Sequence, residues 1–227
     1  MTEEERTAQL TPQEAAERGL LGATQVVPGS GHGISKGRSY GAEPGLISGD
    51  NSASQLLIGV GYPYLSDLAV GNVIADDIAA MDLDDVAVAD VSHTPVAAAQ
   101  TVAEGSYERV IITGAEKIGD GLNTGTPSED PGTIHRRTAA DYPVPGERIV
   151  DRIAECAMGS NTIENVVIVT KAICGLPADT QVLTIEPEYD SWGFDIEEFS
   201  DPVAAAMSEL TDEIVDLLGP ASVSLSE

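Results

Sequence analysis

Apolar runs alternate with amphipathic stretches along most of the chain. The segments QLLIGVG (55–61), DVAVAD (85–90) and RVIITGA (109–115) are apolar runs with the length of buried strands. Between them, residues 67–81 and 95–105 place apolar side chains at helical spacing. The pattern therefore predicts strands and helices in strict alternation.

The second half of the chain continues this alternation. Residues 145–159 predict a helix, because proline stands at its start and glycine just past its end. The apolar runs ENVVIVTKAI (164–173) and TQVLTIEP (180–187) predict two more strands, and residues 201–219 predict a closing amphipathic helix. We also expect His135, in TIHRR, to lie on the face of a strand.

Strands separated by single helices form a mostly parallel sheet that is covered on both faces. We therefore predict an α/β protein, a three-layer α/β/α sandwich, with residues 55–227 as a single domain. Residues 1–54 differ from the rest. A short capped helix is predicted at 11–21, and the Gly- and Ser-rich segment 22–54 predicts an irregular N-terminal arm.

The charge of the chain is strongly negative, with 38 acidic against 11 basic residues and a net charge of −27. Such a surface repels nucleic acid and anionic lipid, so we expect neither as a partner. Adaptation to a high-salt cytoplasm explains the composition, because salt screens the repulsion between carboxylates. A cytoplasmic location also fits the absence of a hydrophobic signal-peptide segment and of an apolar run of ~20 residues.

The chain has two cysteines, Cys156 and Cys174, which are too far apart in sequence for a Cys-x-x-Cys pair. We expect both to be reduced, buried thiols. A nucleophilic role for Cys174, near His93 or His135, is a weaker alternative.

The loop in LIGVGYPYLSDLAVG (57–71) follows the first strand of the predicted sheet. Ligands of parallel sheets bind beyond the carboxyl ends of the strands, and Gly59 and Gly61 predict a ligand close to the backbone there. Asp67 is explained without a ligand as the N-cap of the next helix. A dinucleotide-binding fingerprint is disfavoured, because Tyr64 stands where its third glycine is required.

Four segments together carry a resemblance to a known family: GVGYPYLSDLAVG (59–71), VAVADVSHTPV (86–96), ERVIITGAEK (108–117) and the C-terminal stretch 185–218. In order and spacing, these segments resemble the hydrogenase maturation endopeptidases. The resemblance leaves the N-terminal arm unmatched. It implies an α/β/α sandwich that cuts a C-terminal tail from the large subunit of nickel–iron hydrogenases.

The resemblance also implies a metal site with three ligands: an acid in the first loop, an aspartate ending the third strand, and a histidine opening a later helix. In this chain these positions fall on Leu68, Gly114 and Gly146, and Tyr62 replaces an asparagine of the loop. A leucine would leave a divalent cation under-coordinated. We therefore expect no cofactor and a site that has lost its inherited metal ligands.

A relocated metal site is the alternative. Asp67, Asp90, His93 and Glu116 offer carboxylate and imidazole ligands, which suit nickel or another divalent metal in an active endopeptidase. Three of them also have a structural explanation: Asp67 as the helix N-cap, His93 as a surface or capping residue, and Glu116 as the salt-bridge partner of Lys117.

The sequence IHRR is the densest basic spot in this acidic chain. It either binds an acidic segment or satisfies nearby carboxylates, and we favour the second interpretation.

The main hypothesis is a maturation-protease-like protein that binds a protein or peptide segment without cleaving it, with a metalloenzyme subunit as a candidate source of that segment. The residues expected around the binding cleft are Gly59, Gly61, Tyr62, Tyr64, Leu68, Gly114 and His135. The alternatives are the active metallopeptidase, and a small-molecule hydrolase or nucleotide binder on the same scaffold. Pairing of two copies through the N-terminal arm is also open.

Overall fold

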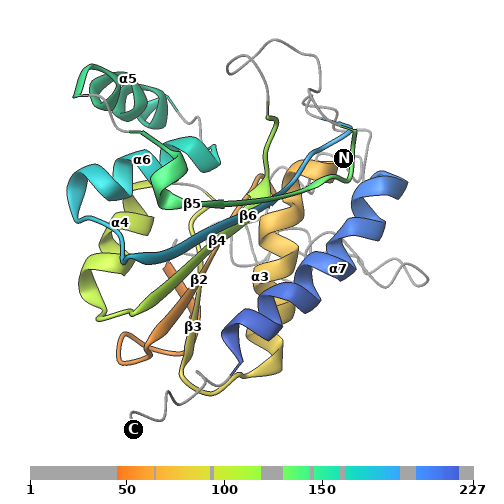
Figure 1. The fold of residues 1–227 in the computed structure, drawn as a ribbon, viewed down its shortest axis with the longest axis horizontal. Coiled ribbons are helices and arrows are strands. Elements are labelled where there is room, and N and C mark those ends of the chain that lie inside the picture. Colours follow the sequence, from red (N-terminus) through yellow and green to blue (C-terminus); the bar gives the residue numbers. More distant parts are fainter. Residues whose placement is uncertain are drawn as a thin grey trace, which may run out of the picture.

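The structure is a computed structural model, and it describes residues 45–63, 65–92, 95–118, 130–143, 146–158, 162–189 and 198–219. Within these ranges the chain forms a six-stranded mixed sheet with helices on both faces (Figure 1). The predicted helix at 11–21 and most of the predicted arm lie outside the described residues, so the boundary after residue 54 stays a prediction.

The strands are β1 (Gly45–Ser48), β2 (Gln55–Val60), β3 (Val86–Asp90), β4 (Arg109–Ala115), β5 (Ile134–Thr138) and β6 (Asp179–Ile185). The α-helices are α3 (Val70–Met81), α4 (Pro95–Glu104), α5 (Gly146–Ala157), α6 (Ile163–Ile173) and α7 (Asp201–Leu218). Two short 3₁₀ helices, η1 (Ser66–Ala69) and η2 (Ala139–Asp141), complete the described elements.

The strand order is β1-β3-β2-β4-β6-β5. The four central strands run parallel, and β1 and β5 are antiparallel at the two edges. The prediction of a mostly parallel α/β sheet is therefore confirmed. Because β3 and β4 flank β2 on opposite sides, the loops after β2 and β4 leave the sheet at the point where the strand order reverses. Parallel sheets bind ligands at such points.

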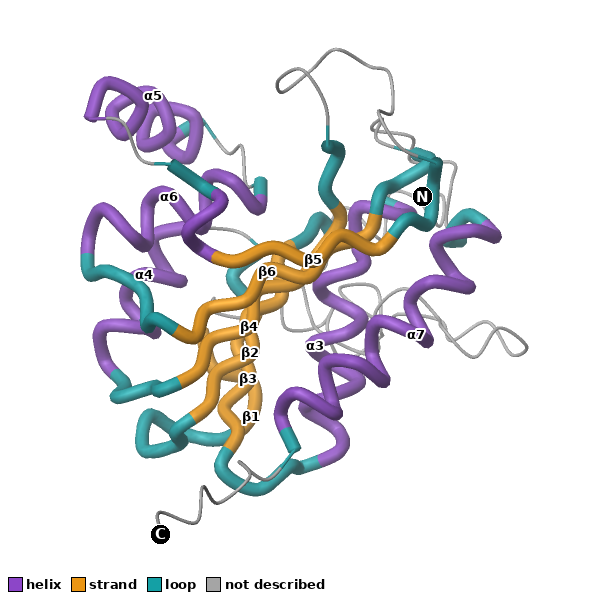
Figure 2. Tube along the Cα trace, in the orientation of Figure 1, coloured by secondary structure: helices purple, strands orange, loops and turns teal. Residues whose placement is uncertain are grey.

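Two hydrophobic cores hold the layers together, one on each face of the sheet. Successive strand residues alternate between them: Leu56 and Ile58 belong to one core, and Leu57 to the other. Helices α3 and α7 cover the face of Leu57, while α4 and α6 cover the opposite face (Figure 2). Helix α5 lies outside α6 and forms an outer layer on that side (Figure 1).

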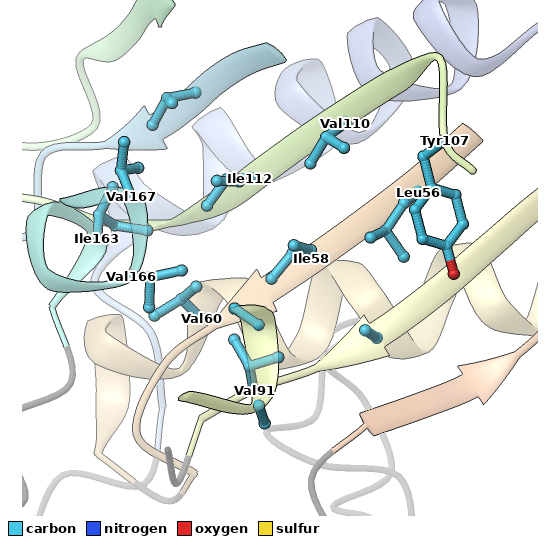
Figure 3. Close-up of a cluster of buried hydrophobic side chains, with 14 of the residues drawn as sticks. Leu56, Ile58, Val60, Val91, Tyr107, Val110, Ile112, Ile163, Val166 and Val167 are labelled. Atoms are coloured by element: carbon cyan, nitrogen blue, oxygen red, sulfur yellow. The ribbon is translucent and has the colours of Figure 1, made fainter. Parts of the chain in front are cut away.

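The core beneath α6 shows how closely this helix approaches the carboxyl ends of the strands. Ile163, in the first turn of α6, packs with Val60 at the end of β2 and with Ile112 of β4 (Figure 3). All three side chains are at most 2% exposed. The start of α6 therefore closes the sheet above the ends of β2 and β4.

Helix α6 corrects one prediction, since residues 164–173 form a helix and not a strand. The valine and isoleucine residues at 166–169 are all buried, and periodicity cannot distinguish a short buried helix from a buried strand. The cap was the available sign of a helix: the Thr162 side chain accepts a hydrogen bond from the N–H group of Asn165 at 3.2 Å. Strand β1, which pairs with β3, lies within the segment predicted as an irregular arm.

Within the described ranges, none of the helices has the length and apolar character that a bilayer-spanning segment requires.

Candidate functional site at the carboxyl edge of the sheet

The glycines of the first loop make room for the protein itself. A Cβ atom at Gly59 would lie 2.3 Å from the carbonyl oxygen of Gly71, and one at Gly71 would lie 2.1 Å from that of Val60. A Cβ atom at Gly61 would lie 2.4 Å from Oδ1 of Asn72. These glycines let the first turn of α3 pack directly against β2 and the loop. Their presence is explained without a ligand close to the backbone.

Asp67 is fully buried inside η1, and its carboxylate holds two distant segments. Its oxygens accept hydrogen bonds from the N–H groups of Glu188 at 2.9 Å, Tyr189 at 3.0 Å and Ser200 at 2.8 Å. The hydroxyl group of Ser200 donates a fourth bond at 2.9 Å. The N-cap prediction for Asp67 is therefore wrong: this carboxylate ties the first loop to the chain after β6 and to the start of α7.

Ser66 strengthens the same connection. Its hydroxyl group donates a hydrogen bond to the carbonyl oxygen of Glu198 at 2.7 Å. Its φ of 46° lies in the left-handed region, which non-glycine residues adopt rarely and at a cost in energy. The bonds of Ser66 and Asp67 to the chain near α7 compensate for this conformation.

Leu68 follows Asp67 in η1 and is half-buried. Its carbonyl oxygen accepts a hydrogen bond from the N–H group of Tyr62 at 2.8 Å, which closes the loop into a ring. Leu68 thus offers an apolar side chain at the position where the family resemblance implies the first metal ligand.

Gly114, near the end of β4, is enclosed by its neighbours. A Cβ atom there would lie 2.3 Å from the carbonyl oxygen of Val60 and 3.0 Å from Cδ1 of Ile163. The first contact is with backbone, which cannot move aside without disturbing the sheet. Packing therefore closes this position to any side chain, including the aspartate that the resemblance implies.

Asp90 ends β3 in a small polar network with Asn72 and Ser92. Nδ2 of Asn72 donates to both carboxylate oxygens of Asp90 at 3.3 Å, and also to the hydroxyl oxygen of Ser92. The N–H group of Ser92 donates to Asp90 at 2.9 Å. Neither Asn72 nor Ser92 was expected at the site from the sequence. The only sign of their role in the sequence is their partner Asp90, an acid at the end of a buried strand.

Glu116 lies two residues beyond Gly114, in a network that joins β4, β5 and β6. Its carboxylate forms an ion pair with Arg137 and accepts hydrogen bonds from the hydroxyl groups of Tyr142 at 3.0 Å and Thr184 at 3.3 Å. The Arg137 guanidinium lies 4.7 Å from the centre of the Tyr142 ring. Burial raises the pKa of Glu116, although Arg137 and the two hydroxyl groups oppose this rise.

Glu186 follows β6 and is fully buried, yet the sequence analysis missed it. Its Oε2 accepts a hydrogen bond from the N–H group of Ile118 at 3.0 Å and lies 3.1 Å from Nε2 of His135. The pairing of Ala115 with Ile185 brings the next residues, Glu116 and Glu186, to the same edge of the sheet. The feature of the sequence that could have pointed to Glu186 is its position as an acid directly after an apolar run.

The basic spot on β5 is matched by carboxylates on both sides of the sheet. Arg136 points toward α7 and forms a two-pronged pair with Glu213, with N–O distances of 2.8 and 2.7 Å. His135 and Arg137 lie on the opposite face, beside Glu186 and Glu116 as described above. The interpretation that IHRR satisfies nearby carboxylates is therefore confirmed.

The proposed relocated ligands belong to separate networks. Asp67 binds backbone near α7, Asp90 binds Asn72 and Ser92, and Glu116 binds the groups around Arg137. No three His, Cys, Asp or Glu side chains of the described residues lie close enough together to hold a metal ion. His93 and Tyr64 lie outside the described residues, so a ligand set that includes His93 stays untested.

The two thiols differ in exposure. Cys156 is half-buried, but Cys174 is exposed, so the prediction of two buried thiols is wrong for Cys174. Partial desolvation of the sulfur atom raises the pKa of each thiol, and Sγ of Cys174 donates to the carbonyl oxygen of Ala99 at 3.4 Å. Neither environment favours the thiolate that a nucleophile requires.

The fold can be compared with solved structures. The nickel–iron hydrogenase maturation protease HycI from Thermococcus kodakarensis matches with a TM-score of 0.52 at 16% identity, over 74% of this chain and 94% of its own. The hydrogenase maturating endopeptidase HybD from Escherichia coli matches with a TM-score of 0.50 at 16% identity, over 72% and 91%. This chain has the hydrogenase maturation protease fold. No protein-family model matches the sequence, and no curated protein does.

A further solved structure, of an endopeptidase from Escherichia coli, matches with a TM-score of 0.50 at 18% identity, over 72% of this chain and 91% of its own. The resemblance drawn from the sequence is thus confirmed at the level of the fold. In this maturation-protease fold, the positions implied for the metal ligands carry a half-buried leucine, an enclosed glycine and a glycine with open space around it. Leu68, Gly114 and Gly146 supply no donor atom from a side chain, so they do not fit a metal ion.

Proposed function

We propose that this chain is a hydrogenase-maturation-protease-like protein that binds a protein or peptide segment at the carboxyl edge of its sheet and does not cleave it. The main support is the packing around Gly114, where a Cβ atom would lie 2.3 Å from the carbonyl oxygen of Val60. An alignment error could hide one metal ligand. It does not account for the absence of donor side chains at all three implied positions, Leu68, Gly114 and Gly146.

Metal-dependent peptide hydrolysis needs a cation with an open coordination position, held by several donor side chains. Leu68 and Gly114 offer none, and the nearby acids are already engaged. Glu116 forms an ion pair with Arg137. The four hydrogen bonds to Asp67 use both of its carboxylate oxygens. Without a set of free donor side chains for a cation, this edge of the sheet is suited to binding a partner and not to hydrolysis.

Several features of the same edge suit a protein segment. Tyr189, next to the Asp67 connection, is 37% exposed, and the neighbouring loop contributes the half-buried Tyr62 and Leu68. Tyrosine is enriched at protein interfaces because it combines a large apolar ring with a hydroxyl group. We infer a role in the maturation or assembly of a metalloenzyme, in the cytoplasm, with a subunit of that enzyme as the partner.

The direct test is incubation of the purified chain with a hydrogenase large-subunit precursor that still carries its C-terminal tail. Complex formation is followed by size-exclusion chromatography with light scattering, and tail length by intact-mass spectrometry. We expect a complex with the tail uncut, weakened by Tyr189→Ala and unchanged by Met81→Ser on the exposed part of α3. Loss of the tail would contradict the non-cleaving role, and the absence of a complex would contradict the choice of partner.

A further inference from the structure

Helix α5 has its apolar side chains on the outside. Val150 is 70% exposed, Ile153 46% and Met158, just past the helix, 81%. Ala154 is also exposed. At 100° per residue these four positions form one stripe along the helix. The outer stripe of α5 (Val150, Ile153, Ala154 and Met158) is therefore an apolar surface in contact with water.

The inner side of α5 carries charge where a packed helix normally carries apolar residues. Arg152 is only 8% exposed and forms ion pairs with Glu155 at 2.8 Å and with Glu164 of α6 at 3.3 Å. The amide of Asn165 on α6 donates to Glu155 at 3.2 Å. The contacts that cross to α6 fix the rotation of α5: if the apolar stripe turned inward, Arg152 would lose Glu164 and Glu155 would lose Asn165.

This orientation reverses the usual arrangement of a surface helix, in which the apolar stripe faces the core. Exposed apolar patches of this kind mark interaction sites. Of the seven large apolar residues that are exposed among the described residues, three belong to the outer stripe of α5. The charged inner face and the apolar outer face together indicate a surface kept for a partner.

We propose that the outer stripe of α5 is a docking surface for an amphipathic helix of a partner protein, with lysine and arginine flanking the apolar ridge of that helix. A helix fits because the side chains of two helices interlock as ridges and grooves. Basic flanks fit because the exposed Asp151 borders the stripe and the chain carries a net charge of −27. The same charge disfavours a second copy of this chain as the occupant.

This inference does not depend on the proposed function, because the outer stripe of α5 does not include Leu68, Gly114 or Gly146, the implied metal-ligand positions. Its test uses two synthetic amphipathic peptides of about 18 residues with the same apolar ridge, one flanked by lysines and one by glutamates. Binding of each labelled peptide to the full-length chain is measured by fluorescence anisotropy at low and high salt. We expect the lysine-flanked peptide to bind, more weakly at high salt, and the glutamate-flanked peptide to bind at least about tenfold more weakly.

The decisive variant combines Val150→Ser, Ile153→Ser and Met158→Ser, and its matched control combines Val96→Ser and Met81→Ser, which change exposed apolar residues elsewhere. We expect the α5 variant to weaken binding of the lysine-flanked peptide at least about tenfold while its melting temperature stays that of the wild type, and the control to bind normally. Equal binding by the two variants, or no binding to the wild type, would overturn the proposal.

Other occupants give distinct results that would also overturn it. A dimer in light scattering that the α5 variant dissociates would assign the stripe to a second copy. Binding of uncharged lipid vesicles that the α5 variant abolishes would assign it to a membrane. Peptide binding that appears only after deletion of residues 1–44 would assign it to the N-terminal part of this chain.

Discussion

The carboxylate of Asp67 accepts hydrogen bonds from both the backbone N–H group and the hydroxyl group of Ser200, at 2.8 and 2.9 Å. This pair joins the loop after the first central strand to the start of the last helix. With the further bonds from Glu188 and Tyr189, one buried side chain fixes the carboxyl edge of the sheet from two directions. Asp67, the acid next to the ligand position that the resemblance implies, therefore has a structural role.

We expect Asp67→Asn to lower the free energy of unfolding by about 2–4 kcal/mol, because the amide group would place donors against backbone donors. Urea unfolding followed by circular dichroism measures this change. Asp84→Asn, at an exposed acid, is the control and should stay within about 0.5 kcal/mol of the wild type. Equal stability of both variants would show that the Asp67 network contributes little.

Gly114 and Gly146 offer a matched comparison, since the family resemblance places metal ligands at both. We expect Gly114→Ala to lower the free energy of unfolding by about 2 kcal/mol or more, because its Cβ would meet the Val60 carbonyl oxygen. A Cβ at Gly146 meets nothing within 4 Å, so Gly146→Ala should change stability by less than about 1 kcal/mol. The same unfolding assay compares them, and a harmless Gly114→Ala would contradict the closed packing.

The sequence predicted the elements whose patterns are local. Strand β4 was predicted with both of its ends, and α7 was bounded by Asp201 and Gly219 as expected. Residues 164–173 were mistaken for a strand because the apolar run at 166–169 is buried on every side and shows no helical period. Strand β1 was missed because its few residues carry little apolar pattern and owe their conformation to pairing with β3.

The candidate site was predictable only in part, because its contacts join residues far apart in the chain. The sequence identified Glu116 and His135, but their partners Arg137, Tyr142 and Glu186 depend on how β4, β5 and β6 lie together. The role of each acid is set by a partner that periodicity cannot show. The loss of donors at the implied metal positions, by contrast, could be read directly from the residue types.

Glu116 should make stability depend on pH. Burial raises its pKa above the value of 4.5 for the unfolded chain, so the folded state keeps the proton to higher pH. The stability contributed by the protonated form is full below the unfolded-state pKa and is lost as the pH rises through the folded-state pKa. The glutamine side chain of Glu116→Gln cannot titrate. We therefore expect this variant to gain stability relative to the wild type as the pH rises from the unfolded-state pKa of Glu116 through its folded-state pKa.

Urea unfolding of the wild type and Glu116→Gln at a series of pH values measures this shift. The control is Glu209→Gln, because the Glu209 side chain is 71% exposed and should give a difference that barely changes with pH. A Glu116→Gln difference that moves the opposite way with pH would mean that Arg137 outweighs burial.

The rotation of α5 predicts a contrast between neighbouring residues. We expect Arg152→Ala to lower the free energy of unfolding by about 1–3 kcal/mol, because it removes the half-shielded ion pairs of Arg152 with Glu155 and Glu164. Val150→Ser should stay within about 0.5 kcal/mol of the wild type, because Val150 is 70% exposed. Thermal unfolding compares the two variants, and the reverse order would show that the apolar stripe faces inward.

The non-cleaving role proposed for this chain requires that the carboxyl edge of the sheet does not hold a metal ion. Native mass spectrometry of the purified full-length chain, titrated with Ni²⁺ and separately with Zn²⁺, tests this claim directly. The account predicts no stoichiometric binding by the wild type, and the same result for Asp90→Asn and Glu116→Gln. One tightly bound ion per chain that either substitution removes would contradict it and would support a metallopeptidase with relocated ligands.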